Sequence, residues 1–301
     1  MIEPTDTIDS TLPSDDQAAI IPLPIDHQDA PEPAAPPIDR ASAQIDELLR
    51  LAEEANADFA DDTFQATEID APTGFLLSVV IPVYNEFESV RTIVGKILAL
   101  PVETEIIIVD DGSTDGTQQV LTELATIANV HVVLKRQNEG KGAALRSGFS
   151  MTQGDIVVVQ DADLEYDPRD IPSLLQPIID GYADVVYGSR FLEQRHRGSS
   201  LTHRFGNRLL TMISNLANGL HLTDMETCYK VIRRDALDEI PLTQNRFGIE
   251  PEITAKIARR EMRIVELPIH YNARSWDDGK KIGFKDAFAA LYCILRYAIA
   301  D

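Results

Sequence analysis

The 301-residue chain lacks the features that mark several large protein classes. It has two cysteines, Cys228 and Cys293, whose spacing suggests neither a disulfide framework nor a metal site. It contains no apolar run approaching the roughly 18 to 20 residues that a membrane-spanning helix needs. No basic segment followed by an apolar one opens the chain, so we expect no secretory signal and a cytoplasmic location. Contact with a membrane would then be peripheral or made through a membrane-protein partner.

Positive charge is also scarce, because 27 Lys and Arg stand against 49 Asp and Glu, for a formal net charge of −22. Without a basic patch interleaved with aromatic residues, such a chain is not expected to bind nucleic acid. Residues 1–72 hold 18 of the acidic residues, two arginines and nine of the 17 prolines. Few of these residues can be buried to offset the entropy of ordering them. We predict a disordered acidic arm over residues 1–72 and a folded domain over residues 73–301.

One stretch of this arm, residues 41–59, has apolar residues at helical spacing: Ile45, Leu48, Leu49 and Ala52. Such a helix could be transient, or it could dock on a partner or on the domain. We favour the transient helix and expect the arm to add little to the stability of the protein.

Glycine-rich phosphate-binding loops are missing where two common nucleotide-binding folds require them. The first apolar run is followed by Tyr84-Asn85-Glu86 and not by a Gly-x-Gly-x-x-Gly turn, which disfavours nicotinamide chemistry. The stretch Gly140-Lys141-Gly142 has neither the preceding glycine nor the Ser or Thr of an ATP-binding loop.

What the chain does have is an alternation of short apolar runs and helical patterns from residue 77 onward. Strands are predicted at 77–83, 105–109, 130–134, 156–159, 185–187 and 231–232, and helices at 87–100, 118–128 and 283–299. This alternation predicts an α/β fold with a mostly parallel sheet flanked by helices.

Pairs of carboxylates follow two of the predicted strands. Asp110 and Asp111 close one, and Asp161 and Asp163 close the run 157–160. In α/β sheets ligands bind at such strand ends. Two carboxylates spaced by one residue repel each other unless a divalent cation or several hydrogen-bond donors lie between them, and Mg²⁺ or Mn²⁺ suits such hard oxygen ligands.

Four motifs taken in order resemble the family 2 glycosyltransferases of GT-A fold, and within them the dolichyl- or polyprenyl-phosphate mannose and glucose synthases. The motifs are residues 80–86 (VIPVYNE), 109–115 (VDDGSTD), 138–142 (NEGKG) and 161–163 (DAD). The resemblance covers the chain from about residue 75 to the end. It implies a metal-dependent, inverting transfer of a sugar from a UDP- or GDP-linked donor to a lipid phosphate.

The resemblance also implies roles for single residues. It places the following around the nucleoside: Pro82, Tyr84, Glu86, Asp110, Asp111 and Lys141. Asp161 would contact the ribose and Asp163 the metal. Glu165 stands where the lipid-phosphate sugar synthases often have a glutamine that binds the metal, and a carboxylate serves a hard cation at least as well.

Three arginines, Arg190, Arg204 and Arg274, have counterparts that hold the donor diphosphate or the acceptor phosphate in the same group. Their planar forks suit bidentate binding of phosphate oxygens. Asp224, Glu226 and Glu250 lie in two polar stretches of the second half. One of them would be the general base for a hydroxyl acceptor, whereas an anionic phosphate needs no base, and the three would then be structural.

The predicted last helix carries an apolar stripe of Phe284, Phe288, Leu291, Tyr292, Leu295 and Ile299. We favour packing of the stripe on the domain over its insertion into a membrane interface. Two alternatives to sugar transfer onto a lipid phosphate remain open. The first is transfer to a soluble or glycan hydroxyl, and the second is a non-catalytic module that binds nucleotide sugars.

Overall fold

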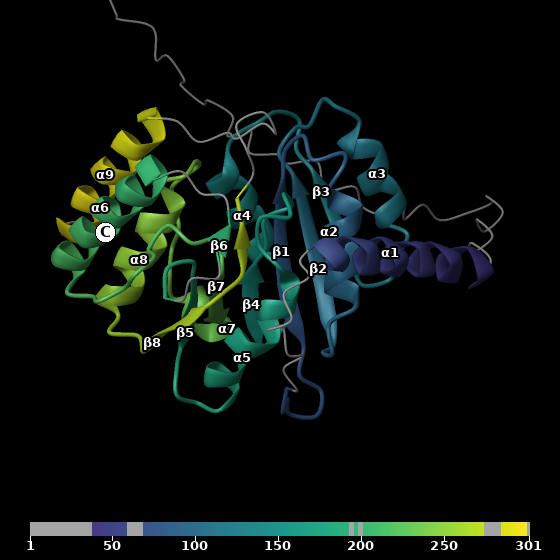
Figure 1. The fold of residues 1–301 in the computed structure, drawn as a ribbon, viewed down its shortest axis with the longest axis horizontal. Coiled ribbons are helices and arrows are strands. Elements are labelled where there is room, and N and C mark those ends of the chain that lie inside the picture. The colour runs from purple at the N-terminus through teal and green to yellow at the C-terminus, as the bar shows by residue number, and fades with distance from the viewer. Residues whose placement is uncertain (1–37, 59–68, 193–195, 198–200, 274–283, 300–301) are drawn as a thin grey trace, which may run out of the picture.

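The computed structural model describes residues 38–58, 69–192, 196–197, 201–273 and 284–299, and its centre is a seven-stranded sheet (Figure 1). The strand order is β3-β2-β1-β4-β7-β5-β8. The strands are β1 (Leu77–Val83), β2 (Thr104–Asp110), β3 (Val130–Leu134), β4 (Ile156–Val159), β5 (Val185–Ser189), β7 (Lys230–Arg233) and β8 (Ile264–Pro268). A second, two-stranded sheet pairs β6 (His196–Arg197) with β9 (Tyr271–Asn272).

Helices flank the large sheet. They are α2 (Val90–Leu98), α3 (Thr117–Leu124), α4 (Lys141–Phe149), α5 (Ile171–Ile179), α6 (Leu201–Asn218), α7 (Arg234–Asp238), α8 (Ile249–Arg259) and α9 (Phe284–Ile299). A short 3₁₀ turn, η1 (Pro168–Asp170), leads into α5. The predicted α/β class with a mostly parallel sheet is confirmed, because β7 alone among the seven strands runs antiparallel to its neighbours β4 and β5.

The buried runs explain why these segments form strands. Every residue of β2 and β4 is buried, and so is β1 apart from the partly exposed Pro82. Strands that are covered on both faces consist of continuous apolar residues, as in parallel sheets. Helix α4 lies close to β1, since a Cβ on Gly148 would come within 2.4 Å of a methyl group of Val80.

The strand order reverses at β1, and this determines where a ligand can bind. The chain runs outward from β1 to β2 and β3, then returns to place β4 on the other side of β1. Loops that leave neighbouring strands at such a switch point diverge and open a crevice at the carboxyl edge of the sheet. The turns after β1 and β4 flank this crevice, and they contain the motifs 84–86 and 161–163.

Part of the predicted arm is an ordered helix. Helix α1 (Ile38–Asp58) packs on α2, with Leu48 and Ala52 buried. The two helices approach closely at Gly95, where a Cβ would lie 2.1 Å from the Leu48 carbonyl oxygen. Of the two expectations for this stretch, the structure has the docked helix and not the transient one. Residues 1–37 and 59–68 lie outside the described residues.

Four of the six residues of the apolar stripe predicted for α9 do not pack on the domain, and for these four the expectation is wrong. The buried face of α9 consists of Ala290, Cys293, Ile294 and Tyr297, whereas Phe288, Tyr292, Leu295 and Ile299 are exposed. Helix α9 therefore has apolar residues on two sides. The side that contains Ala290, Cys293, Ile294 and Tyr297 packs against α6 and α8. Among the described helices, none combines the length and apolar composition that crossing a bilayer requires.

Candidate active site

Two non-glycine residues with left-handed backbone conformation lie at the carboxyl edge of the sheet. Asn85 (φ 55°) follows β1, and Leu164 (φ 61°) follows β4. Such conformations cost free energy, and those that persist are frequent at functional sites. The Asn85 turn is fastened to the turn after β2, because its backbone N–H donates to Ser113 Oγ and its side-chain Oδ1 accepts from the Thr114 N–H, both at 2.8 Å.

The aspartates after β2 hold the loops of this edge together. Asp110 Oδ2 accepts the N–H groups of Gly112 and Ser113 and the side-chain amide of Gln118. The carboxylate of Asp111 accepts the N–H groups of Glu139 and Gly140, at 3.0 and 2.7 Å. Burial raises the pKa of Asp111, although these N–H groups favour its charged form. Both side chains thus shape the expected nucleoside pocket, and contact with a base stays a prediction.

The remaining residues predicted around the nucleoside lie at the end of β1. Pro82 and Tyr84 are partly exposed, and Glu86 is buried. The N–H of Glu86 donates to Thr117 Oγ1 of α3, and its carboxylate accepts from Ser89 Oγ at 2.9 Å. Strand β1 and helix α3 therefore fix the position of Glu86 beside Tyr84.

Asp161 belongs to a chain of ion pairs that reaches into the second half of the protein. The Lys141 ammonium lies 2.8 Å from Asp161 Oδ1 and 3.3 Å from Glu250 Oε1. Burial alone would lower the pKa of Lys141, but the negative charges around it, Asp161 foremost, raise it well above its usual value. Glu250 also accepts from Lys230 Nζ, which is buried at the start of β7.

Glu226 lies near this chain of ion pairs, and one of its oxygens is shielded from solvent. Among the described residues, Oε1 of Glu226 has no hydrogen-bond partner. Burial, together with the charge of Glu250, raises the pKa of Glu226 to about 7. A carboxyl group with such a pKa can exchange a proton near neutral pH.

Asp163 and Glu165 lie on the turn that Leu164 shapes. Asp163 Oδ1 accepts the Glu165 N–H at 3.2 Å, and Glu165 Oε2 accepts from the Tyr271 hydroxyl at 2.8 Å. No three His, Cys, Asp or Glu side chains in the described part of the chain are gathered closely enough to hold a metal ion alone. The donors present fit a cation that takes one or two carboxylates and completes its shell with water and phosphate oxygens, as Mg²⁺ does.

Arg190, directly after β5, forms a bidentate pair with the buried Asp224. Nε and Nη2 of Arg190 lie 2.6 and 2.8 Å from the two oxygens of Asp224, which also accepts from Asn207 of α6. Burial would raise the pKa of Asp224, but Arg190 outweighs it and lowers that pKa. The rings of Tyr166 and Tyr271 lie 5.9 and 5.1 Å from the guanidinium carbon. This is the structural role that the sequence left open for Asp224.

The structure thus unites most of the predicted site at one edge of the sheet. Arg204 lies partly exposed near the start of α6, three residues before Asn207, and Arg274 lies outside the described residues. Sequence reasoning missed Lys230, Asn207, Tyr166 and Tyr271. For Lys230 the sequence did contain a signal, because the lysine directly precedes the predicted strand 231–232. A lysine buried with such a strand needs a negatively charged partner.

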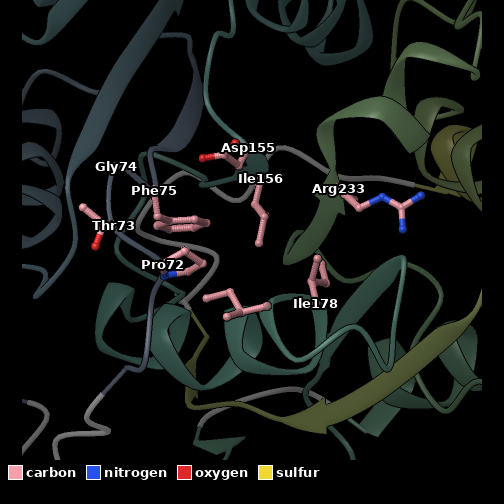
Figure 2. A pocket seen from close by; sticks show the side chains of 9 residues that line it. Pro72, Thr73, Gly74, Phe75, Asp155, Ile156, Ile178 and Arg233 are labelled. Atoms are coloured by element: carbon pink, nitrogen blue, oxygen red, sulfur yellow. The ribbon is translucent and has the colours of Figure 1, made fainter.

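A separate cavity of about 290 Å³ lies at the opposite edge of the sheet, and it contains none of these residues. Figure 2 shows Phe75, Ile156 and Ile178 around it, with Arg233 to one side. Phe75 precedes β1, and Ile156 begins β4. It is a largely apolar hollow at the amino ends of these strands, with Asp155 also in its wall, whereas Asp161 and Asp163 follow the carboxyl end of β4.

Comparison with known proteins adds an independent finding. The model of a family described as glycosyl transferase family 2 matches residues 78–241. The undecaprenyl-phosphate 4-deoxy-4-formamido-L-arabinose transferase of Aeromonas hydrophila is 32% identical over 211 residues, which are 68% of this chain and 62% of that protein. The protein of the same name from Yersinia enterocolitica is 33% identical over 210 residues, with the same two coverages. The chain therefore spans less than two thirds of the length of these relatives.

Solved structures share the fold. Glucosyl-3-phosphoglycerate synthase from Mycobacterium tuberculosis, crystallised with Mn²⁺, UDP and phosphoglyceric acid, has a TM-score of 0.59 and 22% identity, over 85% of this chain and 83% of that one. The same protein with Mg²⁺ and UDP has a TM-score of 0.58 and 23% identity, covering 85% of this chain and 84% of that one. At these identities the likeness concerns the fold, which is of the GT-A type.

Proposed function

The chain belongs to glycosyl transferase family 2, and we propose that it transfers a sugar from a nucleotide-sugar donor to a polyprenyl-phosphate acceptor. The observation that carries the proposal is the gathering of Tyr84, Glu86, Asp161 and Asp163 at the switch point between β1 and β4. The names of the relatives, which cite undecaprenyl phosphate, support the acceptor class.

The donor would lie across the switch point, with its base beside Tyr84 and Glu86 and its ribose at Asp161. Aromatic rings stack on bases, and carboxylates accept the imino hydrogen of uracil or guanine. Lys141 then compensates the charge of Asp161 while holding Glu250 on its other side.

Asp163 and Glu165 would hold Mg²⁺ or Mn²⁺ together with the donor diphosphate. When bound, such a cation offsets the charge that develops on the departing diphosphate. The crystal complexes of the M. tuberculosis synthase with Mn²⁺ or Mg²⁺ and UDP support this choice of cation.

The acceptor would be an anion, which removes the need for a general base. A phosphate oxygen attacks the anomeric carbon, the bond from that carbon to the diphosphate oxygen breaks, and the bonding electrons leave with the nucleoside diphosphate. The configuration at the anomeric carbon is thereby inverted. Arg190, which Asp224 and Asn207 hold in one orientation, would bind phosphate with little further loss of side-chain freedom. Arg204 and Arg274 would serve as the additional phosphate ligands.

A second candidate is transfer to a hydroxyl acceptor, and the state of Glu226 favours it. A carboxyl group with an unpartnered oxygen and a pKa of about 7 is suited to take a proton from a hydroxyl. Under the first candidate, the lipid acceptor would bring the protein to the cytoplasmic face of a membrane.

Donor binding tests the first half of the proposal. We expect GDP-mannose, UDP-glucose or a related nucleotide sugar to raise the unfolding temperature of the purified chain in Mn²⁺, and to raise it much less in excess chelator. A panel of such donors that leaves the unfolding temperature unchanged in Mn²⁺ would contradict the assignment of the nucleoside site.

A further inference from the structure

We infer that Tyr271 is a positioning residue for the divalent cation, because its hydroxyl holds the carboxylate of Glu165 in one orientation beside Asp163. The inference deepens the proposed function and rests on it, since it takes Asp163 and Glu165 as the cation ligands. It assigns a role to a residue outside the four sequence motifs, 106 residues further along the chain than Glu165.

The side chain of Tyr271 connects Glu165 to Arg190. The hydroxyl of Tyr271, the first residue of β9, donates to Glu165 Oε2 at 2.8 Å. At neutral pH a phenol is protonated and a carboxylate can only accept, which fixes the direction of this hydrogen bond. At the ring, the guanidinium carbon of Arg190 lies 5.1 Å from the centroid, within the distance at which a cation is attracted to an aromatic face. Both ends of the side chain therefore contact residues of the candidate site.

The ring of Tyr271 is held in place by the ring of Tyr166. The two centroids are 5.2 Å apart in an edge-to-face arrangement, which is a favourable geometry for aromatic pairs. Tyr166 is itself fixed, because its hydroxyl accepts the N–H of Cys228 at 3.1 Å. Since Tyr271 exposes only 6% of its surface, its ring has little room to turn. Its hydroxyl therefore meets the carboxylate of Glu165 from one direction.

The backbone on both sides of Tyr271 is anchored to the segment that follows β4. The N–H of Asn272 donates to the carbonyl oxygen of Glu165 at 2.9 Å. On the other side, the N–H of His270 donates to Asp170 Oδ2 at 2.7 Å, and His270 Nδ1 lies 2.8 Å from Asp170 Oδ1. Side chains that are locked in this way can hold a binding group to the precision that a site requires.

Glu165 benefits from such a partner, because it lies partly exposed on the turn after β4. A glutamate side chain in this setting has several rotamers, and cation binding must overcome the entropy of fixing one of them. The Tyr271 hydroxyl selects one orientation before the cation arrives. Hydrogen-bond partners behind metal ligands contribute about ten- to a hundredfold to metal affinity. A hydroxyl that only satisfies its own burial would contribute to stability and not to this affinity.

Titration of the full chain with Mn²⁺ tests the inference without any acceptor or turnover. The electron paramagnetic resonance signal of the free ion measures binding, in the presence of UDP and, separately, of GDP. We expect Tyr271→Phe, which keeps the buried ring, to weaken Mn²⁺ binding at least about tenfold. Glu165→Ala should weaken it as well. In the Glu165→Ala background, Tyr271→Phe should change the affinity less than about twofold, because the hydroxyl acts through Glu165.

The matched control is Tyr187→Phe, which removes a buried hydroxyl that is bonded to Thr254 Oγ1 at 2.9 Å. It should bind Mn²⁺ like the wild type, even if its unfolding temperature falls.

Three results would overturn the inference. They are unchanged or tighter Mn²⁺ binding by Tyr271→Phe, unchanged binding by Glu165→Ala, and an equal loss from Tyr271→Phe with and without Glu165. Wild-type protein that binds no Mn²⁺ with either nucleotide would instead contradict the proposed function, and the inference with it. Failure of the inference alone is thus distinct from failure of the proposed function.

Discussion

Arg190 and Asp224 form a buried pair in which each charge depends on the other. Removing one partner of such a pair leaves an uncompensated buried charge, which costs more than the pair itself contributes. The same holds for Lys141, Glu250 and Lys230, which connect α4, α8 and β7 through their charges. Substitutions at these positions therefore change stability and activity together, and they are poor tests of chemistry.

Asp163 is a better test, because it is partly exposed and lies on a surface turn. We expect Asp163→Asn to lower sugar transfer at least about a hundredfold, since a neutral amide binds a divalent cation weakly. Donor affinity in Mn²⁺ should fall to the value that the wild type shows in chelator, while the unfolding temperature stays the same. Asp180→Asn, at an exposed position after α5, is the control and should behave as the wild type. Full activity in the Asp163 variant would remove the cation from the mechanism.

Glu226 gives a pH-dependent prediction for stability. Burial and the charge of Glu250 raise its pKa from 4.5 to about 7 in the folded protein. Between these values the folded state binds more protons than the unfolded state, so the free energy of unfolding falls as the pH rises. Glu226→Gln should match the wild type near pH 5 and be more stable by about 2 kcal/mol at pH 8.

Chemical denaturation at several pH values measures this difference, with the exposed Glu239→Gln as the control. A stability difference between Glu226→Gln and the wild type that stays constant with pH would show that Glu226 does not titrate near neutrality.

Some of these residues could be predicted from the sequence, and others could not. Asp161 and Asp163 stand out because two carboxylates directly follow an apolar strand. Arg190 and Asp224 are 34 residues apart in the sequence, and the fold of the chain between them brings the two side chains together. No local sequence pattern predicts such a long-range pair. The burial of Lys230 likewise follows from the position of β7 inside the sheet.

At the scale of elements, α1 shows how packing overrides composition. Its exposed residues are largely charged, and the segment around it is acidic and rich in proline, which favours disorder. The buried side chains of Leu48 and Ala52 nevertheless dock it on α2, where Gly95 allows the two backbones to approach closely. Helical spacing predicts such a helix but not whether a partner surface exists for it.

We expect Leu48→Ala to lower the free energy of unfolding by about 2 kcal/mol, because the substitution leaves a cavity between α1 and α2. Gly95→Ala should have a comparable effect, although alanine usually stabilises a helix, since its Cβ would collide with the Leu48 carbonyl. Asp46→Ala, on the exposed side of α1, is the control. Equal unfolding midpoints for all three variants and the wild type would show that α1 does not contribute to the fold.

The strands illustrate which structural features the periodicity of apolar residues can predict and which it cannot. Continuous apolar runs predict β1, β3 and β4 with the bounds that the structure has. The antiparallel direction of β7 is not visible in its composition, because burial on both faces gives the same apolar pattern in either direction. For α9 the spacing predicts a stripe, but a helix with two apolar sides does not reveal which one packs.

At the scale of the whole molecule, three features lie around one edge of the sheet. The turns of the switch point would take the nucleotide, Arg190 would take a phosphate, and Asp224 with Asn207 of α6 holds Arg190 in place. A lipid phosphate as acceptor would account for an arginine that is fixed in one orientation beside the expected donor site.

The most direct test of this account is the fate of the sugar. Radiolabelled nucleotide sugar, polyprenyl phosphate and soluble sugar acceptors are offered to the protein together, and the label is partitioned between an organic and an aqueous phase. We predict label in the organic phase, for the wild type and, within a few-fold, for Glu226→Gln, because an anionic acceptor needs no base. Label confined to a water-soluble product, and lost with Glu226→Gln, would contradict the lipid acceptor and establish the hydroxyl acceptor in its place.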